Sequence, residues 1–234
     1  MQTRHWACLA ALLLMPVLTS CESSGAASPA TAQVKATRSA GPLPAAQLTQ
    51  VTDQALLTAS TLSGATQQQQ LAVPESAVSG CGKHLKSDAD VIETKTNTWS
   101  GGKLTITETA VGYHGITATA VVAQAKKLLT SCHHYTTTEY GVISHETITG
   151  FFTIDALTGT DAVYTYCDQS KTVTPVSAKG TTTTCIALLA RGPVMVSLQV
   201  QMKGTGYASR TPLRTLAPQA TARLVAAVPT GTTA

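Results

Sequence analysis

The most regular hydrophobic pattern in the chain lies near its C-terminal end, where apolar and polar residues alternate strictly. This period of two predicts a strand with one face in a core and the other toward water. The segment Thr182–Ala190 precedes it across the short turn Arg191-Gly192-Pro193, which predicts two antiparallel neighbours. The alternating apolar positions are Val194, Val196, Leu198, Val200 and Met202.

Further segments have the composition of strands, rich in Val, Ile, Thr and aromatic residues. The first two of them are separated by Ser100-Gly101-Gly102, which predicts a hairpin. The predicted strands are Val91–Trp99, Lys103–Val111, His134–Tyr140, Ile148–Ile154 and Ala162–Cys167.

Three segments have apolar residues at intervals of three or four, which predicts helices. They are Pro44–Ala59, Ile116–Ser131 and Leu213–Ala227. Pro44 is compatible with a first helical turn, whereas Pro218 is expected to kink or restart the last helix. The period of the second helix places Cys132 on its inner side, near the sheet.

Helices at the beginning, middle and end of a run of antiparallel strands predict an α+β fold. We expect a twisted antiparallel sheet with flanking helices stacked on one face. The other face is then partly solvated or curled into a groove. The domain is predicted to span residues 44–228, a single-domain length.

The N-terminal region has the pattern of an export signal. Arg4 is followed by an apolar run from Trp6 to Val17, which is too short to span a bilayer as a helix. The residues Leu18-Thr19-Ser20-Cys21 look like a bacterial lipobox, in which cleavage occurs before a lipid-modified cysteine. We therefore predict a lipoprotein signal peptide at residues 1–20 and lipidation at Cys21; the alternative is a secreted protein with an incidental cysteine. No other run is long and apolar enough to be transmembrane.

Residues 21–43 are mostly Ser, Ala, Thr, Gly and Pro, so they bury too little apolar surface to offset the entropy of ordering. We expect a flexible tether that holds the domain roughly 25 Å from the membrane. The predicted location is the cell membrane, on its extracellular face, through the lipid anchor.

The cysteine count fits an exported protein. Cys8 lies in the signal peptide and Cys21 carries lipid, so four cysteines remain in the domain. An even number in an exported chain indicates two disulfides. Three pairings are possible, and four reduced thiols are the alternative. The four are Cys81, Cys132, Cys167 and Cys185.

Composition argues against several partners. The net charge is +4, and it becomes +3 when Arg4 is removed with the signal; only 12% of residues are charged. So few charges produce an electrostatic field that is too weak to indicate binding of nucleic acid or of an acidic partner. Aromatic residues make up 4% of the chain, so any stacking platform would use few of them.

Catalytic motifs are largely missing from the sequence. His145-Glu146 begins an H-E-x-x-H motif, but position 149 is Thr, so the second zinc ligand is missing. A metal site built from His114, His133 and His145 is conceivable. We prefer the interpretation that these are surface or partly buried histidines, and we expect no metal and no cofactor.

Other polar and aromatic residues have structural explanations that we prefer. Turns and strand ends account for Asp155, Asp161 and Asp168, with acid chemistry as the alternative. Core packing accounts for Trp99, Tyr113 and Tyr135, with the lining of a cleft as the alternative.

The order of these elements and cysteines resembles a known family. An N-terminal helix, a cysteine, strands with Trp99, a helix ending at Cys132 and paired strands carrying Cys185 resemble the extracellular sensor domain of PknH-type receptor kinases. That domain also occurs in actinobacterial sensor-domain lipoproteins. The resemblance covers Leu43–Ala227 and implies two disulfides, a cleft for an unidentified ligand and no known catalysis.

The resemblance also guides the cysteine pairing. Members commonly have a cysteine just beyond the last strand, where this chain has Met202-Lys203, and this chain has Cys167 instead. The implied pairing is therefore Cys167–Cys185 and Cys81–Cys132.

We expect a lipid-anchored ligand-binding or sensing module of the envelope that is not an enzyme. Its predicted partners are the membrane and an unidentified small ligand or envelope protein. The alternatives are an envelope scaffold protein without a small ligand and a hydrolase built from scattered residues. A groove lined by apolar residues would favour ligand binding, and a Ser or Cys within hydrogen-bond reach of a His would favour a hydrolase.

Overall fold

The computed structural model describes residues 42–62, 65–68, 78, 81–139, 142–155, 157–173, 180–204, 208–232 and 234. The predicted signal peptide, Cys21 and nearly all of the predicted tether lie outside the described residues. Leu43, the last residue of the predicted tether, packs against the core.

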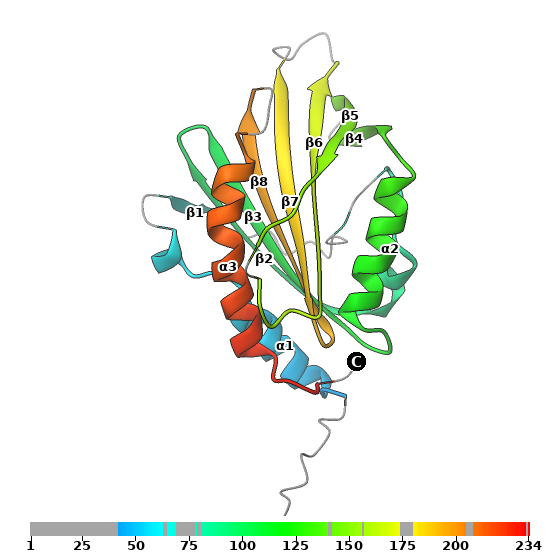
Figure 1. The fold of residues 1–234 in the computed structure, drawn as a ribbon, viewed down its shortest axis with the longest axis vertical. Coiled ribbons are helices and arrows are strands. Elements are labelled where there is room, and N and C mark those ends of the chain that lie inside the picture. Colours follow the sequence, from blue (N-terminus) through cyan, green and yellow to red (C-terminus); the bar gives the residue numbers. More distant parts are fainter. Residues whose placement is uncertain are drawn as a thin grey trace, which may run out of the picture. The chain divides into compact units, whose positions relative to one another are not determined.

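The strands within the described residues form one antiparallel sheet (Figure 1). Its order is β1-β2-β3-β8-β7-β6-β5-β4, so the pair formed by β7 and β8 lies at the centre. The α+β class and the antiparallel sheet are confirmed. The strands are β1 Thr66–Gln68, β2 Val91–Gly101, β3 Leu104–Tyr113, β4 His134–Glu139, β5 Val142–Phe151, β6 Ala162–Thr172, β7 Thr181–Arg191 and β8 Val194–Lys203.

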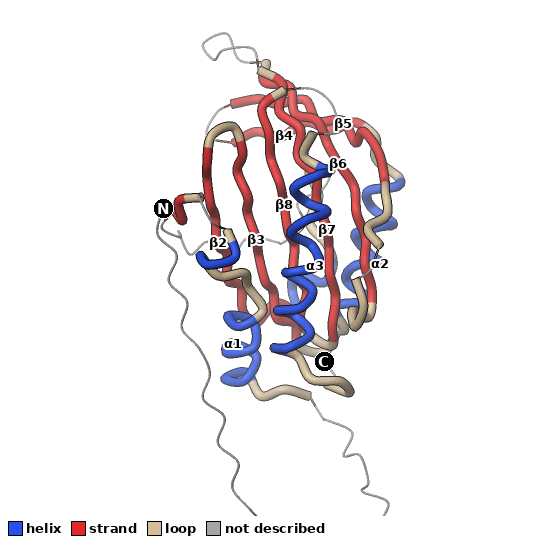
Figure 2. The backbone as a smooth tube through the Cα atoms, turned by 60° about the vertical axis from the view of Figure 1, so that its left-hand side comes forward, coloured by secondary structure: helices blue, strands red, loops and turns tan. Residues whose placement is uncertain are grey.

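The helices cover both faces of the sheet, not one face as the sequence led us to expect (Figures 1 and 2). α1 (Ala45–Gln54) and α3 (Arg210–Ala227) pack on one face, and α2 (Ala118–Thr130) packs on the other. Two short 3₁₀ helices, η1 (Ala59–Thr61) and η2 (Lys86–Asp90), lie in the loops. The described helices lack the length and apolar character that crossing a bilayer requires.

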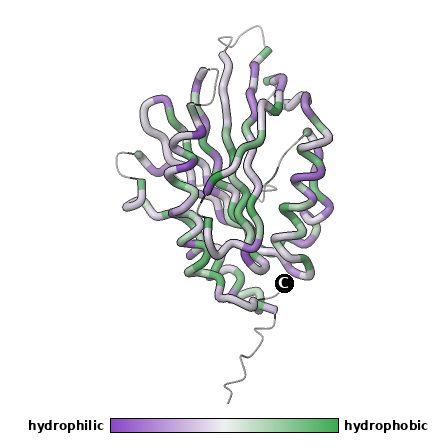
Figure 3. Tube along the Cα trace, viewed as in Figure 1, coloured by the Kyte–Doolittle hydropathy of each residue, from purple (hydrophilic) through white to green (hydrophobic). Residues whose placement is uncertain are grey.

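The central strands explain why helices are needed on both faces. In β7, Cys185, Ala187 and Leu189 pack toward α1 and α3, while Ile186 and Leu188 pack toward α2. All five are buried. Figure 3 shows hydrophobic residues concentrated along the part of these strands nearest their connecting turn. A strand buried on both faces needs a cover on each side.

The polar positions of β8 were only partly predicted correctly. The alternation suggested that Ser197 and Gln199 face water, but Ser197 is fully buried on the α2 side and Gln199 is half-buried. Only toward the end of the strand, at Gln201 and Lys203, is this side exposed. Burial differs along the strand because α2 covers only one end of this face of the sheet.

Most element boundaries were predicted to within a few residues, with four differences. β6 ends at Thr172, five residues after the predicted end at Cys167. α1 ends at Gln54 and not at Ala59, because Leu56 and Leu57 leave the helix and are buried in the core. β5 begins at Val142, six residues before the predicted start. α3 continues through Pro218 without restarting.

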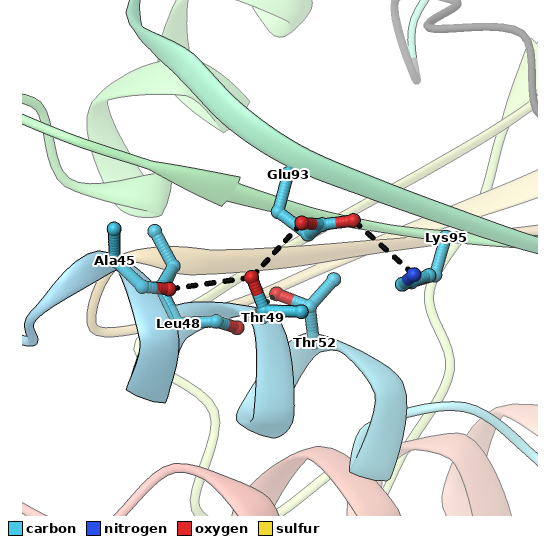
Figure 4. A network of polar contacts seen from close by, with 6 residues as sticks. All are labelled: Ala45, Leu48, Thr49, Thr52, Glu93 and Lys95. Atoms are coloured by element: carbon cyan, nitrogen blue, oxygen red, sulfur yellow. Dashed lines mark hydrogen bonds and ion pairs between the residues drawn. The ribbon is translucent and has the colours of Figure 1, made fainter.

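Polar contacts attach α1 to strand β2 (Figure 4). The Thr49 hydroxyl donates to Glu93 Oε2 at 2.9 Å, and Lys95 Nζ lies 3.4 Å from Glu93 Oε1. The helix also lies close to β3, because a Cβ atom at Gly112 would lie 2.6 Å from Leu48 Cγ. Glycine at 112 therefore permits this close approach.

Two disulfides hold the fold together. Cys81 is bonded to Cys132, which joins the segment before η2 to the end of α2. Cys167 is bonded to Cys185 directly across the β6–β7 ladder. This is the pairing that the family resemblance implied.

Candidate functional site

An apolar pocket of about 380 Å³ lies between η1, the β2–β3 hairpin and the first half of α3. Its most buried lining residues are Leu62, Trp99, Ile106 and Leu216, each no more than 7% exposed. The other lining residues are Thr61, Ala65, Gly101, Leu104, Pro212 and Thr215.

The local sequence explains how these side chains meet. Trp99 lies directly opposite Ile106 in the β2–β3 register, so both side chains leave the sheet on the α3 side. Pro212 and Leu216 are four residues apart and therefore share one side of α3. Short Gly and Thr side chains complete the rim.

One buried polar group of a lining residue has no partner. The indole N–H of Trp99 is buried and has no hydrogen-bond acceptor among the described residues. A buried unpaired donor costs about 1–3 kcal/mol, so each one calls for an explanation.

Glu108 lies two residues beyond Ile106 on the same face and is completely buried. The backbone N–H of Leu57 donates to its Oε2 at 2.6 Å, whereas Oε1 has no partner within the described part of the chain. Burial raises the pKa of Glu108 to about 8, although the Leu57 hydrogen bond and the charge of Arg223 oppose this shift. The carboxyl group is therefore largely protonated at neutral pH.

A second polar cluster lies on the opposite face of the sheet, next to α2. Tyr135 donates its hydroxyl proton to Asp168 Oδ2 at 3.2 Å, and Thr137 donates to Glu146 Oε1 at 3.2 Å. Burial and the charge of Glu146 raise the pKa of Asp168 to about 7. Burial and the charge of Asp168 raise the pKa of Tyr135 as well. A pKa of about 7 means that the carboxyl group of Asp168 is about half protonated at neutral pH.

A third feature is a groove of about 400 Å³ beside the second half of α2. Lys83, Lys86 and Lys127 line it together with His84, and Leu85 and Leu128 contribute apolar surface. The three lysines are exposed, so the groove is basic but is not built around a buried polar group.

The structure does not bring the three candidate histidines together. His114 lies just before α2 and His133 just after it, and a helix of 13 residues is about 20 Å long. His145 lies on β5, where its Nδ1 is 3.3 Å from Thr136 Oγ1. Across the described residues, no three His, Cys, Asp or Glu side chains could hold one metal ion.

The three aspartates are in different environments. Asp155 is exposed in a loop, and Asp161 accepts a hydrogen bond from the Gly192 backbone N–H at 2.7 Å, as expected for a loop residue. Asp168 instead is half-buried inside β6, away from its ends, so a turn or strand end was the wrong explanation for it.

The three aromatic candidates are also separated. Tyr113 packs in the core beneath α2, as expected. Tyr135 belongs to the Asp168 cluster, and Trp99 lines the apolar pocket on the other face of the sheet. Core packing, the preferred explanation, is thus correct for Tyr113 and Trp99, and Tyr135 packs against the core while also bonding to Asp168.

Two site residues were missed in the sequence. Glu108 occupies the core-facing position of the Ile106-Glu108-Ala110 alternation, which is a readable signal of a buried carboxyl group. Glu146 was considered only as part of a metal motif. The rings of His84, His134 and His145 contact Thr or Asp side chains, and no Ser or Cys is hydrogen-bonded to a histidine ring in the described part.

Comparison with known proteins supports the fold. No protein-family model matches the chain, and no curated protein matches it either. The crystal structure of the extracellular domain of PknH from Mycobacterium tuberculosis matches with a TM-score of 0.51 and 14% sequence identity. The match covers 79% of this chain and 96% of that domain. At this identity the likeness establishes a PknH-like fold.

Proposed function

We propose that this protein is a non-catalytic sensing domain that binds a small ligand outside the cytoplasm and is held at the membrane by lipid on Cys21. The observation that carries the proposal is the apolar pocket between η1, the β2–β3 hairpin and α3, whose described lining contains no charged residue. A concave, mostly apolar site with few polar groups is the usual form of a small-molecule site.

The location rests on three features that support one another. The lipobox-like residues before Cys21 fit export and lipidation, and the two disulfides fit an oxidising compartment. The fold is that of a domain described as extracellular in PknH. A diacylglyceryl cysteine supplies two acyl chains, which is enough for stable anchoring. The chain then fits the sensor-domain lipoproteins of actinobacteria.

The domain boundaries are part of the same proposal. Residues 1–20 form the signal peptide, residues 21–43 the tether and residues 44–228 the sensing domain. A tether of about 20 residues leaves the pocket free to face either the membrane or the cell wall.

Lipidation is tested by the mass of the mature N-terminal peptide. We expect protein from an actinobacterial host to begin at Cys21 and to carry acyl mass on it, whereas Cys21→Ala protein lacks that mass and leaves the membrane fraction. An unmodified N-terminus at another residue would contradict the anchor. The disulfides and the pocket would be unaffected by that result.

Ligand binding is tested by native mass spectrometry of protein purified from the same host. We expect a fraction of the molecules to carry an additional small-molecule mass that disappears on denaturation. Protein expressed in an unrelated host serves as the control, since it lacks the native ligand. Host protein without any bound mass at any purification stage would contradict the sensing function.

A further inference from the structure

We propose that the basic groove beside the second half of α2 docks on the anionic head groups of the membrane to which the protein is anchored. The inference rests on the proposed anchor at Cys21 and adds the orientation of the domain. Because α2 and α3 pack on opposite faces of the sheet, docking through this groove turns the apolar pocket away from the bilayer (Figures 1 and 2).

The positive charges of the groove come from two segments that a disulfide joins. Lys83 and Lys86 follow Cys81 closely in the sequence, and Lys127 lies in the last turn of α2. Cys81 is bonded to Cys132, two residues after the end of α2. The bond therefore keeps the two lysine-bearing segments side by side.

These lysines are accessible to an external partner. Lys126, which lies beside the groove, and the three lining lysines are all exposed, and none of the four forms an ion pair with a described residue. Residues 114–138, which include α2, contain neither Asp nor Glu. Positive charge is therefore concentrated here, although the chain as a whole carries few charges.

The described carboxylates near the groove are fewer than these lysines. η2 carries Asp88 and Asp90, and Asp88 Oδ2 lies 3.4 Å from His84 Nδ1. Farther along the same face of the sheet, Glu146 is only 9% exposed, and Asp168 is about half protonated at neutral pH. Most of the lysine charge therefore stays uncompensated within the described structure.

The basic residues of α3, on the opposite side of the domain, have contacts within the fold. Arg223 Nε donates to the Leu56 carbonyl oxygen at 3.0 Å. The guanidinium groups of Arg210 and Arg214 lie 4.7 and 5.8 Å from the centre of the Phe152 ring. An anionic surface is therefore attracted more strongly to the α2 side than to the α3 side.

The bilayer is the anionic partner that an anchored protein always has within reach. A tether of about 20 residues spans about 70 Å when fully extended, which exceeds the roughly 40 Å diameter of a domain of this size. Either side of the domain can therefore reach the membrane. Each lysine near an anionic surface strengthens binding about fivefold, so the four lysines select the α2 side.

Two charge-matched variants test the docking surface by co-sedimentation with vesicles. The mature chain, made without the signal peptide and without lipid, is mixed with vesicles of equimolar phosphatidylglycerol and phosphatidylcholine. We expect Lys83→Gln/Lys127→Gln to weaken binding about 25-fold, and high salt to weaken wild-type binding as well. The control Lys103→Gln/Lys171→Gln has the same net charge and should bind within about twofold of wild type. Lys103 lies in the β2–β3 turn, and Lys171 shares the side of β6 that carries Cys167 toward α3. Equal losses in both variants would overturn the proposal, because net charge alone would then explain binding.

Acetylation of lysines on the same vesicles shows the orientation directly. We expect labelling of Lys83, Lys86 and Lys127 to fall about threefold when the wild-type chain is bound. Labelling of Lys103 and Lys171 should not change, and vesicles of phosphatidylcholine alone should protect no lysine. Uniform protection of all five would contradict the proposed orientation.

Inorganic phosphate distinguishes the bilayer from a soluble anion as the occupant of the groove. We expect phosphate to leave the labelling of the groove lysines as it is in sodium chloride of the same ionic strength. If phosphate alone protects them, the groove holds a soluble anion and membrane docking is wrong. These assays use no lipid on Cys21 and no pocket ligand, so their failure would leave the anchor and the sensing function standing. An unmodified Cys21 in the host would, conversely, leave the vesicle result unchanged.

Discussion

Replacing Cys81 and Cys132 together by alanine is expected to lower the free energy of unfolding by about 4 kcal/mol. This disulfide closes a loop with a sequence separation of 51 residues, whereas Cys167–Cys185 spans 18. In the chain-entropy model, the longer loop restricts the unfolded chain more, by about 1 kcal/mol. Urea unfolding of the oxidised proteins measures the difference.

Reduction of the wild-type protein provides the matching control. The reduced wild type and the reduced Cys81→Ala/Cys132→Ala variant should have nearly the same stability, since neither then has a disulfide. Non-reducing peptide mapping should also show Cys167 linked to Cys185 in the variant. A loss below about 1 kcal/mol on removing Cys81–Cys132 would show that the loop is already restricted in the unfolded state.

The elements with strong periodicity were predictable from the sequence because their apolar residues recur at the spacing of a strand or a helix. The alternation at Val194–Met202 and the three-to-four spacing around Val121 each identified an element correctly. β5 was shifted because its first half, including Ser144 and His145, is polar on both faces and lies toward an edge of the sheet. Periodicity carries no information where neither face is buried.

The layer arrangement was not predictable for a related reason. The pattern of β8 indicated one buried face, yet Met195 and Ser197 are buried beneath α2 on the other. Short-range patterns indicate which residues can be buried. The face of the sheet that a helix covers depends instead on chain connections such as the segment from Tyr113 into α2. Sequence reasoning therefore placed all helices on one face.

The candidate sites were predictable only in part because they combine residues from distant strands. Asp168 and Tyr135 were each singled out in the sequence, but the β4–β5–β6 pairing that brings them together is a long-range feature. Trp99 was expected to pack in the core, which is correct, and lining a cleft was the less favoured alternative. Its pocket also needs α3, which follows it by more than 100 residues in the chain.

The stability of the domain is expected to fall as pH rises from about 5 to 8, because the carboxyl groups of Glu108 and Asp168 hold protons that the unfolded chain releases. The pKa of Glu108 is about 8 in the folded protein against a model value of 4.5, and that of Asp168 is about 7 against 3.8. Each contribution is complete below the unfolded pKa and is lost as pH passes the folded pKa. Urea unfolding at pH 5, 7, 8 and 9 measures the decline.

Between pH 7 and pH 8 the change comes mainly from Glu108, because Asp168 is already about half ionised in the folded protein at pH 7. We expect wild-type stability to fall by about 1.4 kcal/mol across this interval and that of Glu108→Gln by only about 0.4 kcal/mol. Glutamine can still accept the Leu57 hydrogen bond, but its amide N–H groups lack a partner, so its overall stability is lower. Ile106→Val, on the same strand face, is the control: it should lower stability by about 1 kcal/mol at every pH without changing the slope. A Glu108→Gln profile parallel to that of the wild type would mean that Glu108 is already ionised in the folded protein, with Arg223 compensating its buried charge.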